Sequence, residues 1–383
     1  MSKQYLARYW VEQGNRLLYI EVPFHPFSLA SRPGEVRHLW RRYVGGPQQV
    51  EPRLWVQSYP VLYPYRAGWP LAGTRWMLRF NQVVVRPQLI ALCRRLDFRQ
   101  PLVLVGTATA LPLIDALEPL LVVYHCSDDY TCQRTFPASF ASLERDLISR
   151  CDLVICTAEA LRQAKTHLHP HTYTVTNGAQ VEHFARAQAP DTLVAQELRD
   201  LPHPIVGYIG TVFQWLDQEM IAHASRAHPN WSFVFVGPIT TEVNQLRTLP
   251  NVHLLGPRLY ADLPSYLKGF DVATVPFIFH DVTLRASPIK FYEYLASGVP
   301  VVATRLPDFE PFAHLVSLVT SPVEFVTALE DTITCDTPQK RRARMAEARN
   351  HSWAARFAQI DRFIKERLAA KEQRWSNSET STP

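Results

Sequence analysis

The feature of the sequence that most constrains its fold is an alternation of short apolar runs with longer amphipathic segments, which occurs twice along the chain. The first series predicts strands at residues 102–105, 120–124, 153–156 and 173–175. The second series predicts strands at residues 205–209, 232–236, 252–255, 272–275 and 299–303. Alternating strands and helices are typical of parallel sheets with helices on both faces. The sequence therefore predicts an α/β protein with two Rossmann-like, doubly wound domains.

A polar, proline-containing segment separates the two series and marks a domain boundary. We expect an N-terminal domain over residues 1–184, a linker over 185–204 and a C-terminal domain over 205–337. An amphipathic helix over 338–371 can cross back to the N-terminal domain, and the polar residues 372–383 are expected to form a disordered tail. Two such domains imply a ligand-binding cleft at the carboxyl ends of their strands.

Composition narrows the classes of protein to which the chain can belong. Of its 383 residues, 47% are hydrophobic, which is enough for large cores and excludes wholesale disorder. The six cysteines are too few for a disulfide scaffold, and none lies in a C-x-x-C pair, so a zinc ribbon is not expected. No basic start precedes an apolar run, and prolines and acidic residues interrupt the most apolar stretch. We therefore expect a cytoplasmic protein without a membrane span.

The first hundred residues are strongly basic. They contain 15 Lys and Arg against 5 Asp and Glu, whereas the rest of the chain contains 25 against 30. Aromatic residues are interleaved with the arginines between Arg37 and Arg86. This pattern predicts peripheral association with an anionic membrane surface, on the inner face of the cytoplasmic membrane. Nucleic acid is not expected as a partner, because no recognition motif accompanies the charge. The alternative is that the arginines lie on solvated faces and the aromatic residues in a core.

The start of the chain departs from the usual order of a doubly wound domain. Residues 4–10 predict a helix directly after Met1, and residues 16–22 predict a strand, whereas such a domain normally begins with a central strand. A missing strand would leave unpaired backbone groups inside the sheet. We therefore expect that the natural product begins upstream of Met1, or that this version of the chain is poorly stable and weakly active. The alternative is that the region 23–90 supplies a substitute strand.

The sharpest motif is Ala-Ser-Pro-Ile-Lys-Phe-Tyr-Glu-Tyr-Leu-Ala-Ser-Gly-Val-Pro-Val-Val, at residues 286–302. Ser287 is a good N-cap, Pro288 suits the first helical position, and Gly298 suits the end of the helix. The motif therefore predicts a helix that begins at 288 and is followed by a strand.

The same helix carries side chains that suit a nucleotide. Free N–H groups at a helix start bind phosphate, and Lys290 on the first turn would add a positive charge. Glu293, one turn later, could accept hydrogen bonds from two sugar hydroxyls. A phosphate site beside a ribose site would bind a nucleotide. The alternative is an ordinary capped helix with a Lys290–Glu293 pair at i,i+3 spacing.

The motif at 286–302 resembles the donor-binding signature of bacterial GT-B glycosyltransferases, especially those of the retaining family 4 type that build surface polysaccharides such as teichuronic acid. Three further stretches resemble strands of their donor domain, at residues 206–211, 233–238 and 251–256. Two stretches are similar to their acceptor-domain motifs, at residues 124–130 and 176–178. The resemblance covers nearly the whole chain and implies the GT-B fold.

The resemblance also implies roles for single residues. Glu293 is expected to hold the nucleotide ribose and Lys290 the diphosphate, with the backbone of residues 286–289 stabilising the phosphate. The implied donor-binding residues are Gly210, Thr211, Ser287, Pro288, Ile289, Lys290 and Glu293. The resemblance implies catalytic roles for His125 and Lys290. Arg285 is a third catalytic candidate on chemical grounds, because a guanidinium can stabilise a diphosphate. No metal ligands are expected.

Two of these assignments keep alternatives. His125 stands at a strand end where many relatives place a histidine near the transferred sugar, but it can equally be an ordinary exposed or core histidine. Many relatives carry two glutamates eight positions apart, and this chain has Arg285 where the earlier one would stand. Arg285 could instead meet the diphosphate as a bidentate guanidinium. Asp128 and Asp129, which follow His125 in the sequence, are as suitable for the N-terminus of a helix as for a functional site.

The resulting functional expectation is a hexosyltransferase-type glycosyltransferase that uses a nucleotide sugar and a glycan or lipid-linked acceptor. Retention of configuration is implied by the resemblance alone. No metal or other cofactor is expected, because the helix N-terminus, Lys290 and Arg285 could stabilise the diphosphate leaving group. The alternatives are a nucleotide-sugar epimerase and an inactive glycan-binding relative. A Rossmann oxidoreductase is disfavoured, since no G-x-G-x-x-G motif follows a strand.

Overall fold

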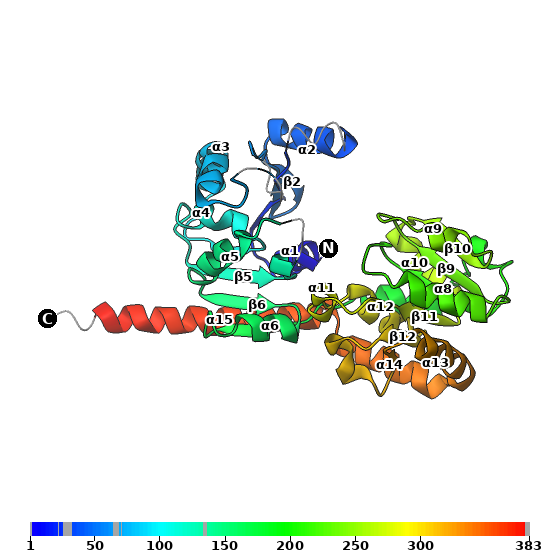
Figure 1. Cartoon of the computed structure of the whole chain (residues 1–383). Helices are drawn as coiled ribbons and strands as arrows, with labels where there is room; N and C mark the ends of the chain where they lie inside the picture. Colours follow the sequence, from blue (N-terminus) through cyan, green and yellow to red (C-terminus); the bar gives the residue numbers. More distant parts are fainter. Residues whose placement is uncertain are drawn as a thin grey trace. The chain divides into compact units, whose positions relative to one another are not determined.

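The computed structural model describes residues 2–21, 23–25, 33–63, 69, 71–132 and 136–379 (Figure 1). The chain forms two compact units. Unit 1 consists of Met1–Thr157, Leu161–Val175 and Phe357–Pro383, and unit 2 consists of Ala158–Ala160 and Thr176–Arg356. Residues 176–184, expected in the N-terminal domain, belong to unit 2, because helix α7 (Val181–Ala185) packs on helices of that unit.

The main sheet of unit 1 has four parallel strands in the order β4-β5-β6-β7. These strands are β4 (Leu102–Val105), β5 (Leu121–Cys126), β6 (Leu153–Cys156) and β7 (Thr172–Thr174). The four strands predicted in the first series are confirmed, two of them at their predicted bounds. Strand β5 is buried along its whole length and is paired on both edges.

A smaller sheet of unit 1 has the order β1-β3-β2. Strand β1 (Leu17–Ile20) is parallel to β3 (Leu54–Gln57), which is antiparallel to β2 (Gln48–Glu51). In the main sheet every described strand is hydrogen-bonded to its neighbour, with β5 in the interior. The expected gap of unpaired backbone groups inside the sheet is therefore absent from the described strands.

Helices accompany both sheets of unit 1. They are α1 (Ser2–Glu12), α2 (Pro33–Gly45), α3 (Arg75–Arg95), α4 (Leu111–Ile114), α5 (Phe140–Ile148) and α6 (Glu159–Lys165). Helix α5 shows why these segments are helical and where they pack. Its buried Phe140, Leu143 and Leu147 recur at the spacing that places side chains on one face of a helix.

Unit 2 contains one sheet of six parallel strands in the order β10-β9-β8-β11-β12-β13. The strands are β8 (Ile205–Ile209), β9 (Ser232–Val236), β10 (Val252–Gly256), β11 (Val272–Val275), β12 (Val301–Thr304) and β13 (Ser317–Val319). The first five confirm the predicted strands, with β12 beginning two residues later than expected; β13 was not predicted. The chain builds outward from β8 to β10 and then returns to β11 on the other side of β8. Ligands bind at such a switch point, beside the carboxyl ends of the strands.

Seven further helices lie in the unit 2 part of the chain that the structure describes. They are α8 (Gln218–Ala227), α9 (Asn244–Arg247), α10 (Leu263–Gly269), α11 (Asp281–Leu284), α12 (Ile289–Ser297), α13 (Pro322–Cys335) and α14 (Pro338–Asn350). Short side-chain caps begin several of them. In α8, for example, the Asp217 carboxylate accepts the N–H of Met220 at 2.9 Å.

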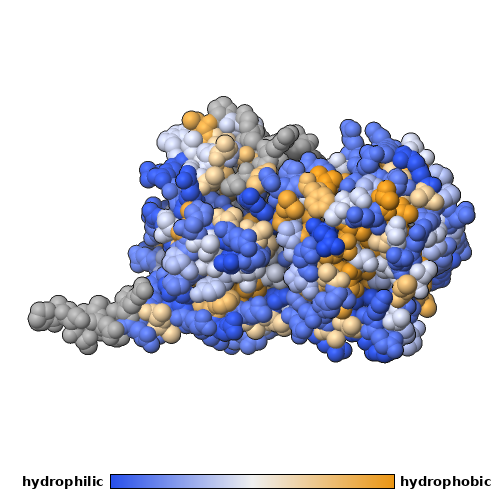
Figure 2. All heavy atoms as spheres, turned by 60° about the horizontal axis from the view of Figure 1, so that its bottom comes forward, coloured by the Kyte–Doolittle hydropathy of each residue, from blue (hydrophilic) through white to orange (hydrophobic). Residues whose placement is uncertain are grey.

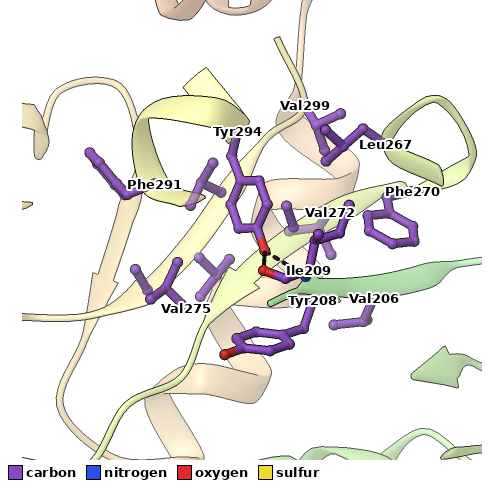
Figure 3. Packing of buried hydrophobic residues seen from close by; sticks show 14 of the residues in the cluster. Val206, Tyr208, Ile209, Leu267, Phe270, Val272, Val275, Phe291, Tyr294 and Val299 are labelled. Atoms are coloured by element: carbon purple, nitrogen blue, oxygen red, sulfur yellow. Dashed lines mark hydrogen bonds between the residues drawn. The ribbon is translucent and has the colours of Figure 1, made fainter. Parts of the chain in front are cut away.

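A buried tyrosine joins helix α12 to strand β8 (Figure 3). The hydroxyl of Tyr294 accepts the N–H of Ile209 at 2.7 Å and lies 3.2 Å from the carbonyl oxygen of the same residue, to which it donates. The surrounding residues are apolar and buried. Because both hydrogen bonds lie in a buried apolar cluster, the tyrosine fixes α12 beside the end of β8.

The C-terminal helix is interrupted, contrary to the expectation of one helix over 338–371. Helix α14 ends at Asn350, and α15 (Trp353–Glu379) begins after a short break. At the break the N–H of Ala179 donates to the carbonyl oxygen of His351 at 3.0 Å, and the N–H of Trp353 donates to that of Ala179 at 3.2 Å. The carbonyl oxygen of His351 and the N–H of Trp353 thus bond to Ala179 instead of to groups of a continuous helix.

Helix α15 belongs to unit 1 from Phe357 onward. There Phe363 stacks on Tyr173 of β7 with ring centroids 4.2 Å apart, and Lys371 pairs with Asp152 at 3.1 Å. The helix extends to Glu379, so residues 372–379 are helical where a disordered tail was expected.

The surface is mixed in polarity. On the face that Figure 2 shows, hydrophilic residues predominate and hydrophobic residues lie in separate groups. Within the described part of the chain, no helix has the length and apolar character needed to cross a membrane.

Candidate functional site

The candidate site lies at the start of helix α12, which connects β11 to β12 on the carboxyl side of the unit 2 sheet. The predicted helix is confirmed, but its first turn differs from the expectation. Pro288 is the N-cap, with φ −69° and ψ 117°, and no side chain caps the helix. Gly298 ends the helix in the left-handed region at φ 75°, as predicted. Ile289 is therefore the first helical residue.

Ser287 does not cap the helix because its hydroxyl is used elsewhere. It accepts the backbone N–H of Asn177 at 3.3 Å and lies 3.3 Å from the hydroxyl of Tyr292. The Asn177 side-chain amide also donates to the carbonyl oxygen of Ser287 at 2.6 Å. Asn177 therefore holds the segment that leads into α12. Residues 176–178 were singled out from the sequence, but no role was assigned to Asn177.

Lys290 lies on the first turn of α12 in an aromatic and partly buried setting. Its ammonium donates to the hydroxyl of Tyr208 at 2.5 Å and lies 4.2 Å from the centre of that ring. The ring of Phe277 is 4.9 Å away. Burial lowers the pKa of Lys290 to about 7, although Glu293 opposes this shift. An anion bound beside Lys290 would restore the charged form.

The loop after β8 passes directly beside this lysine. Gly210 has a φ of +140°, and a Cβ on it would lie 2.7 Å from both Cε and Nζ of Lys290. Gly237, after β9, has a φ of +148°, and a Cβ there would lie 2.2 Å from the carbonyl oxygen of Gly210. Both positions therefore need glycine, for conformation and for space. Thr211 follows on the surface, and its carbonyl oxygen accepts the Tyr208 hydroxyl at 2.8 Å.

Glu293 lies one turn after Lys290, and its residue surface is 8% exposed. One carboxylate oxygen, Oε1, accepts the hydroxyl of Tyr260 at 3.4 Å. The other, Oε2, has no hydrogen-bond partner within the residues that the structure describes. Burial raises the pKa of Glu293 to about 7, against the effect of Lys290 and Tyr260. This carboxylate therefore has unused capacity to accept hydrogen bonds.

The structure brings most of the predicted donor-binding residues together in unit 2. Gly210 lies against Lys290, and Pro288, Lys290 and Glu293 belong to α12 or its N-cap. Arg285 is the residue that ends α11, and it is partly buried two residues before Ser287. Its predicted contact with a diphosphate stays a prediction.

His125 belongs to unit 1, where it lies on β5 and is 4% exposed. Its Nδ1 has no hydrogen-bond partner among the described residues. Burial, reinforced by the charge of Lys3, lowers the pKa of His125 to about 3. The imidazole is therefore neutral near pH 7.

Lys3 is a neighbour of His125 that sequence reasoning missed. Its ammonium donates to the hydroxyl of Ser127 at 3.1 Å, and it lies so near Gly106 that a Cβ there would be 2.5 Å away. Burial raises the pKa of Asp128, and the positive charge of Lys3 partly offsets this increase. No spacing in the sequence could have indicated this cluster, because its members come from α1 and from the ends of β4 and β5.

No group of three or more His, Cys, Asp or Glu side chains that could hold a metal ion is found among the residues with described positions.

Comparison with known proteins gives one family match and one curated relative. Residues 203–334 match the family described as Glycosyl transferases group 1. TuaH of Bacillus subtilis (strain 168), described as a teichuronic acid biosynthesis glycosyltransferase, is 28% identical over 281 residues, which cover 67% of this chain and 70% of TuaH.

Solved structures show similarity over most of the chain. Sucrose-phosphate synthase from Thermosynechococcus elongatus has a TM-score of 0.61 at 15% identity, covering 93% of this chain and all of the other. Alr3699/HepE from Anabaena, in complex with UDP, has a TM-score of 0.60 at 17% identity and covers 92% of this chain and 100% of HepE. These likenesses confirm the predicted fold. The family match includes Gly210, Lys290 and Glu293.

Proposed function

From the premise that this chain is a glycosyltransferase of the GT-B fold, as the family match and the relatives show, we propose that it transfers a sugar from a nucleoside diphosphate donor to a hydroxyl group. This hydroxyl group belongs to a glycan or to a lipid-linked acceptor. The relatives support this proposal: TuaH is described as acting in teichuronic acid biosynthesis, and HepE was solved with UDP.

One observation carries the proposal, namely the arrangement of Lys290 and Glu293 at the start of α12. The backbone N–H groups of Ile289 and Lys290 are at the helix start, where no side chain caps them. Such groups bind phosphate oxygens, and the adjacent ammonium of Lys290 adds charge. Glu293 is one turn further along, and its Oε2 is available to the hydroxyls of a ribose.

The chemical demand of the reaction is the negative charge that develops on the departing diphosphate. A helix N-terminus and a lysine that becomes charged on binding stabilise that charge most strongly in a partly buried site. Arg285 adds a second cation if it reaches the phosphates. These groups support a reaction that does not require a metal ion or another cofactor. Retention of configuration at the transferred carbon is proposed from the resemblance to retaining enzymes.

His125 is the proposed residue of unit 1 that acts near the transferred sugar. A neutral imidazole can donate one hydrogen bond and accept another, which suits contact with a sugar hydroxyl. Its unpaired Nδ1 supports such a role. Lys3 is a positioning residue in this proposal, because its charge helps to keep the imidazole neutral.

The place of action is proposed to be the cytoplasmic face of the membrane, with the protein bound peripherally. The basic character of the first hundred residues supports this part of the proposal, and so does a lipid-linked acceptor.

The test is incubation of the purified protein with a panel of nucleotide sugars, with and without glycan acceptors, in the presence and absence of EDTA. We expect acceptor-dependent release of nucleoside diphosphate that persists in EDTA and is lost in Lys290→Ala. Release of an epimerised nucleotide sugar without an acceptor would indicate an epimerase instead. Glycan binding with no turnover of any donor would indicate an inactive relative, and activity restored only by manganese would overturn metal independence.

A further inference from the structure

Helix α3 of unit 1 carries a stripe of exposed apolar side chains. Trp76 is 62% exposed, Phe80 40% and Val83 68%, and they recur at the i, i+4, i+7 spacing of one helix face. The rings of Trp76 and Phe80 are stacked, with centroids 5.5 Å apart and planes 8° apart. The opposite face of α3 is buried, with Met77, Val85 and Leu89 among its core residues. The exposed stripe is therefore not needed to hold α3 on its own unit.

The charged side chains of α3 itself all have one sign. The 21 residues of α3 include five arginines and no acidic residue. Arg79 and Arg86 are exposed between and beyond the apolar side chains, and neither has a carboxylate partner in the described part of the chain. Arg75 is different, because it pairs with Asp146 at 2.6 Å. The face thus combines large apolar groups with unpaired cations.

Helix α2 repeats the same combination. Trp40 is 45% exposed and Val44 is 69% exposed, and Arg37 and Arg41 are exposed on the same helix without a carboxylate partner among the described residues. The two helices are in contact, since the side-chain amide of Gln88 on α3 donates to the hydroxyl of Tyr43 on α2 at 3.1 Å. Figure 1 shows both helices on the side of unit 1 away from α15.

We propose that the exposed faces of α2 and α3 together form a docking surface for an anionic lipid bilayer. This inference rests on the proposed use of a lipid-linked acceptor and gives that proposal a location on the molecule. Tryptophan and phenylalanine side chains partition into the interface between headgroups and acyl chains, and the valines add apolar area. The arginines contact lipid phosphates, which they can bind through two N–H groups at once.

The chemistry of the surface favours a bilayer over other partners. A second copy of the chain would bring unpaired arginines against arginines, because the nearby carboxylates of Asp146 and Glu21 are already paired with Arg75 and Arg42. Nucleic acid would use the aromatic rings by stacking, but Val44 and Val83 offer it nothing comparable. A lipid surface accommodates both the rings and the aliphatic groups.

The test is cosedimentation of the full chain with vesicles of phosphatidylcholine alone or of phosphatidylcholine and phosphatidylglycerol in equal parts. The apolar variant is Trp76→Ser with Phe80→Ser, and the charge variant is Arg79→Gln with Arg86→Gln. We expect the wild type to prefer the anionic vesicles and to bind them less in high salt. Each double variant should lose about tenfold or more in affinity for them.

Matched controls come from exposed positions of unit 2. Val323→Ser removes a side chain that is 66% exposed on α13, and Arg226→Gln with Arg247→Gln removes two exposed arginines of α8 and α9. These controls should bind like the wild type. Melting curves and circular dichroism of every variant show whether it is folded, and only folded variants are compared.

Several outcomes would overturn the docking surface. They are equal binding to both kinds of vesicle, unchanged binding by both double variants, a dimer in gel filtration that the double variants dissolve, or retention of nucleic acid that they abolish. Donor turnover with a soluble acceptor is measured in parallel. Vesicle binding without turnover would count against the proposed sugar transfer alone. Turnover without vesicle binding would count against the docking surface and the proposed membrane location, and would leave the sugar transfer standing.

Discussion

The side chain of Lys290 lies against the Cα of Gly210, so that a Cβ at residue 210 would lie 2.7 Å from Cε and from Nζ of the lysine. The two residues are on the loop after β8 and on the first turn of α12. The position of the ammonium therefore depends on the absence of a side chain in a different element.

Gly210→Ala should displace Lys290 and lower the affinity for UDP about tenfold or more, because a hydrogen bond to a charged group contributes roughly 1.5–3 kcal/mol. The control is Gly256→Ala. Gly256 also has a positive φ, +74°, but nothing lies within 4 Å of its Cβ position. Gly256→Ala shows what a methyl group at a positive φ does to UDP binding by itself, and the φ of +140° at Gly210 strains an alanine more than the φ of +74° at Gly256. Thermal melting identifies the folded variants, and calorimetry with UDP then compares their affinities. Equal affinities of the two variants would contradict the assigned role of Lys290.

Asn177→Ala should lower the free energy of unfolding by about 1–3 kcal/mol and weaken donor binding, because the buried carbonyl oxygen of Ser287 loses its amide donor. Ser287→Ala is the comparison, since it keeps that carbonyl and removes the hydroxyl, which contacts Asn177, Tyr292 and Asp308. Urea titration should show the smaller loss for Ser287→Ala. The reverse order would mean that the hydroxyl, rather than the amide bond, holds the segment before α12.

Glu293→Ala should weaken donor binding by about 1.5–3 kcal/mol, because two ribose hydroxyls would lose a charged acceptor. Calorimetry with UDP measures this, and Tyr260→Phe serves as a control that keeps the carboxylate and removes its only hydrogen-bond donor among the described residues. A dissociation constant unchanged by Glu293→Ala would remove the ribose assignment.

UDP affinity should be greatest near pH 7 and should fall on both sides. Burial lowers the pKa of Lys290 to about 7, so above this pH the free lysine is neutral and binding must take up a proton. Burial raises the pKa of Glu293 to about 7, so below this pH the carboxyl is protonated and accepts fewer hydrogen bonds. Lys290→Arg should lose the alkaline decline, because arginine stays charged, and Glu293→Gln should lose the acidic decline. If the wild type, Lys290→Arg and Glu293→Gln showed the same dependence of UDP affinity on pH, Lys290 and Glu293 could not be the titrating groups.

His125 should make unit 1 sensitive to acid. Burial lowers the pKa of His125 to about 3 from a usual value of 6.5, so the unfolded chain takes up a proton in a pH range where the folded protein does not. The contribution of His125 to the free energy of unfolding is therefore fully present above pH 6.5 and is lost as the pH falls toward 3. Between pH 7 and pH 5 the wild type should lose about 2 kcal/mol more than His125→Gln, measured by urea unfolding. Parallel losses in the two proteins would show that His125 does not stay neutral in the fold.

Much of the fold could be predicted from residue patterns. Fully buried parallel strands are short runs of apolar residues, so β4, β6, β8, β9 and β11 were found at their observed bounds. Strand β13 was missed because three residues at the sheet edge give no recognisable pattern. The break between α14 and α15 was missed because the backbone of Ala179, far away in the sequence, causes it.

For the site, the sequence by itself determined which helix carries Lys290 and Glu293 and how far apart they are, because helical spacing and a C-terminal glycine are local properties. The tertiary structure decided that Ser287 bonds to Asn177 instead of capping α12, that Gly210 makes room for Lys290, and that Lys3 lies beside Ser127. It also decided the pKa values of Lys290, Glu293 and His125, which depend on burial. Contacts between residues distant in the chain, and the loss of water around a charged group, exist only once the strands have assembled.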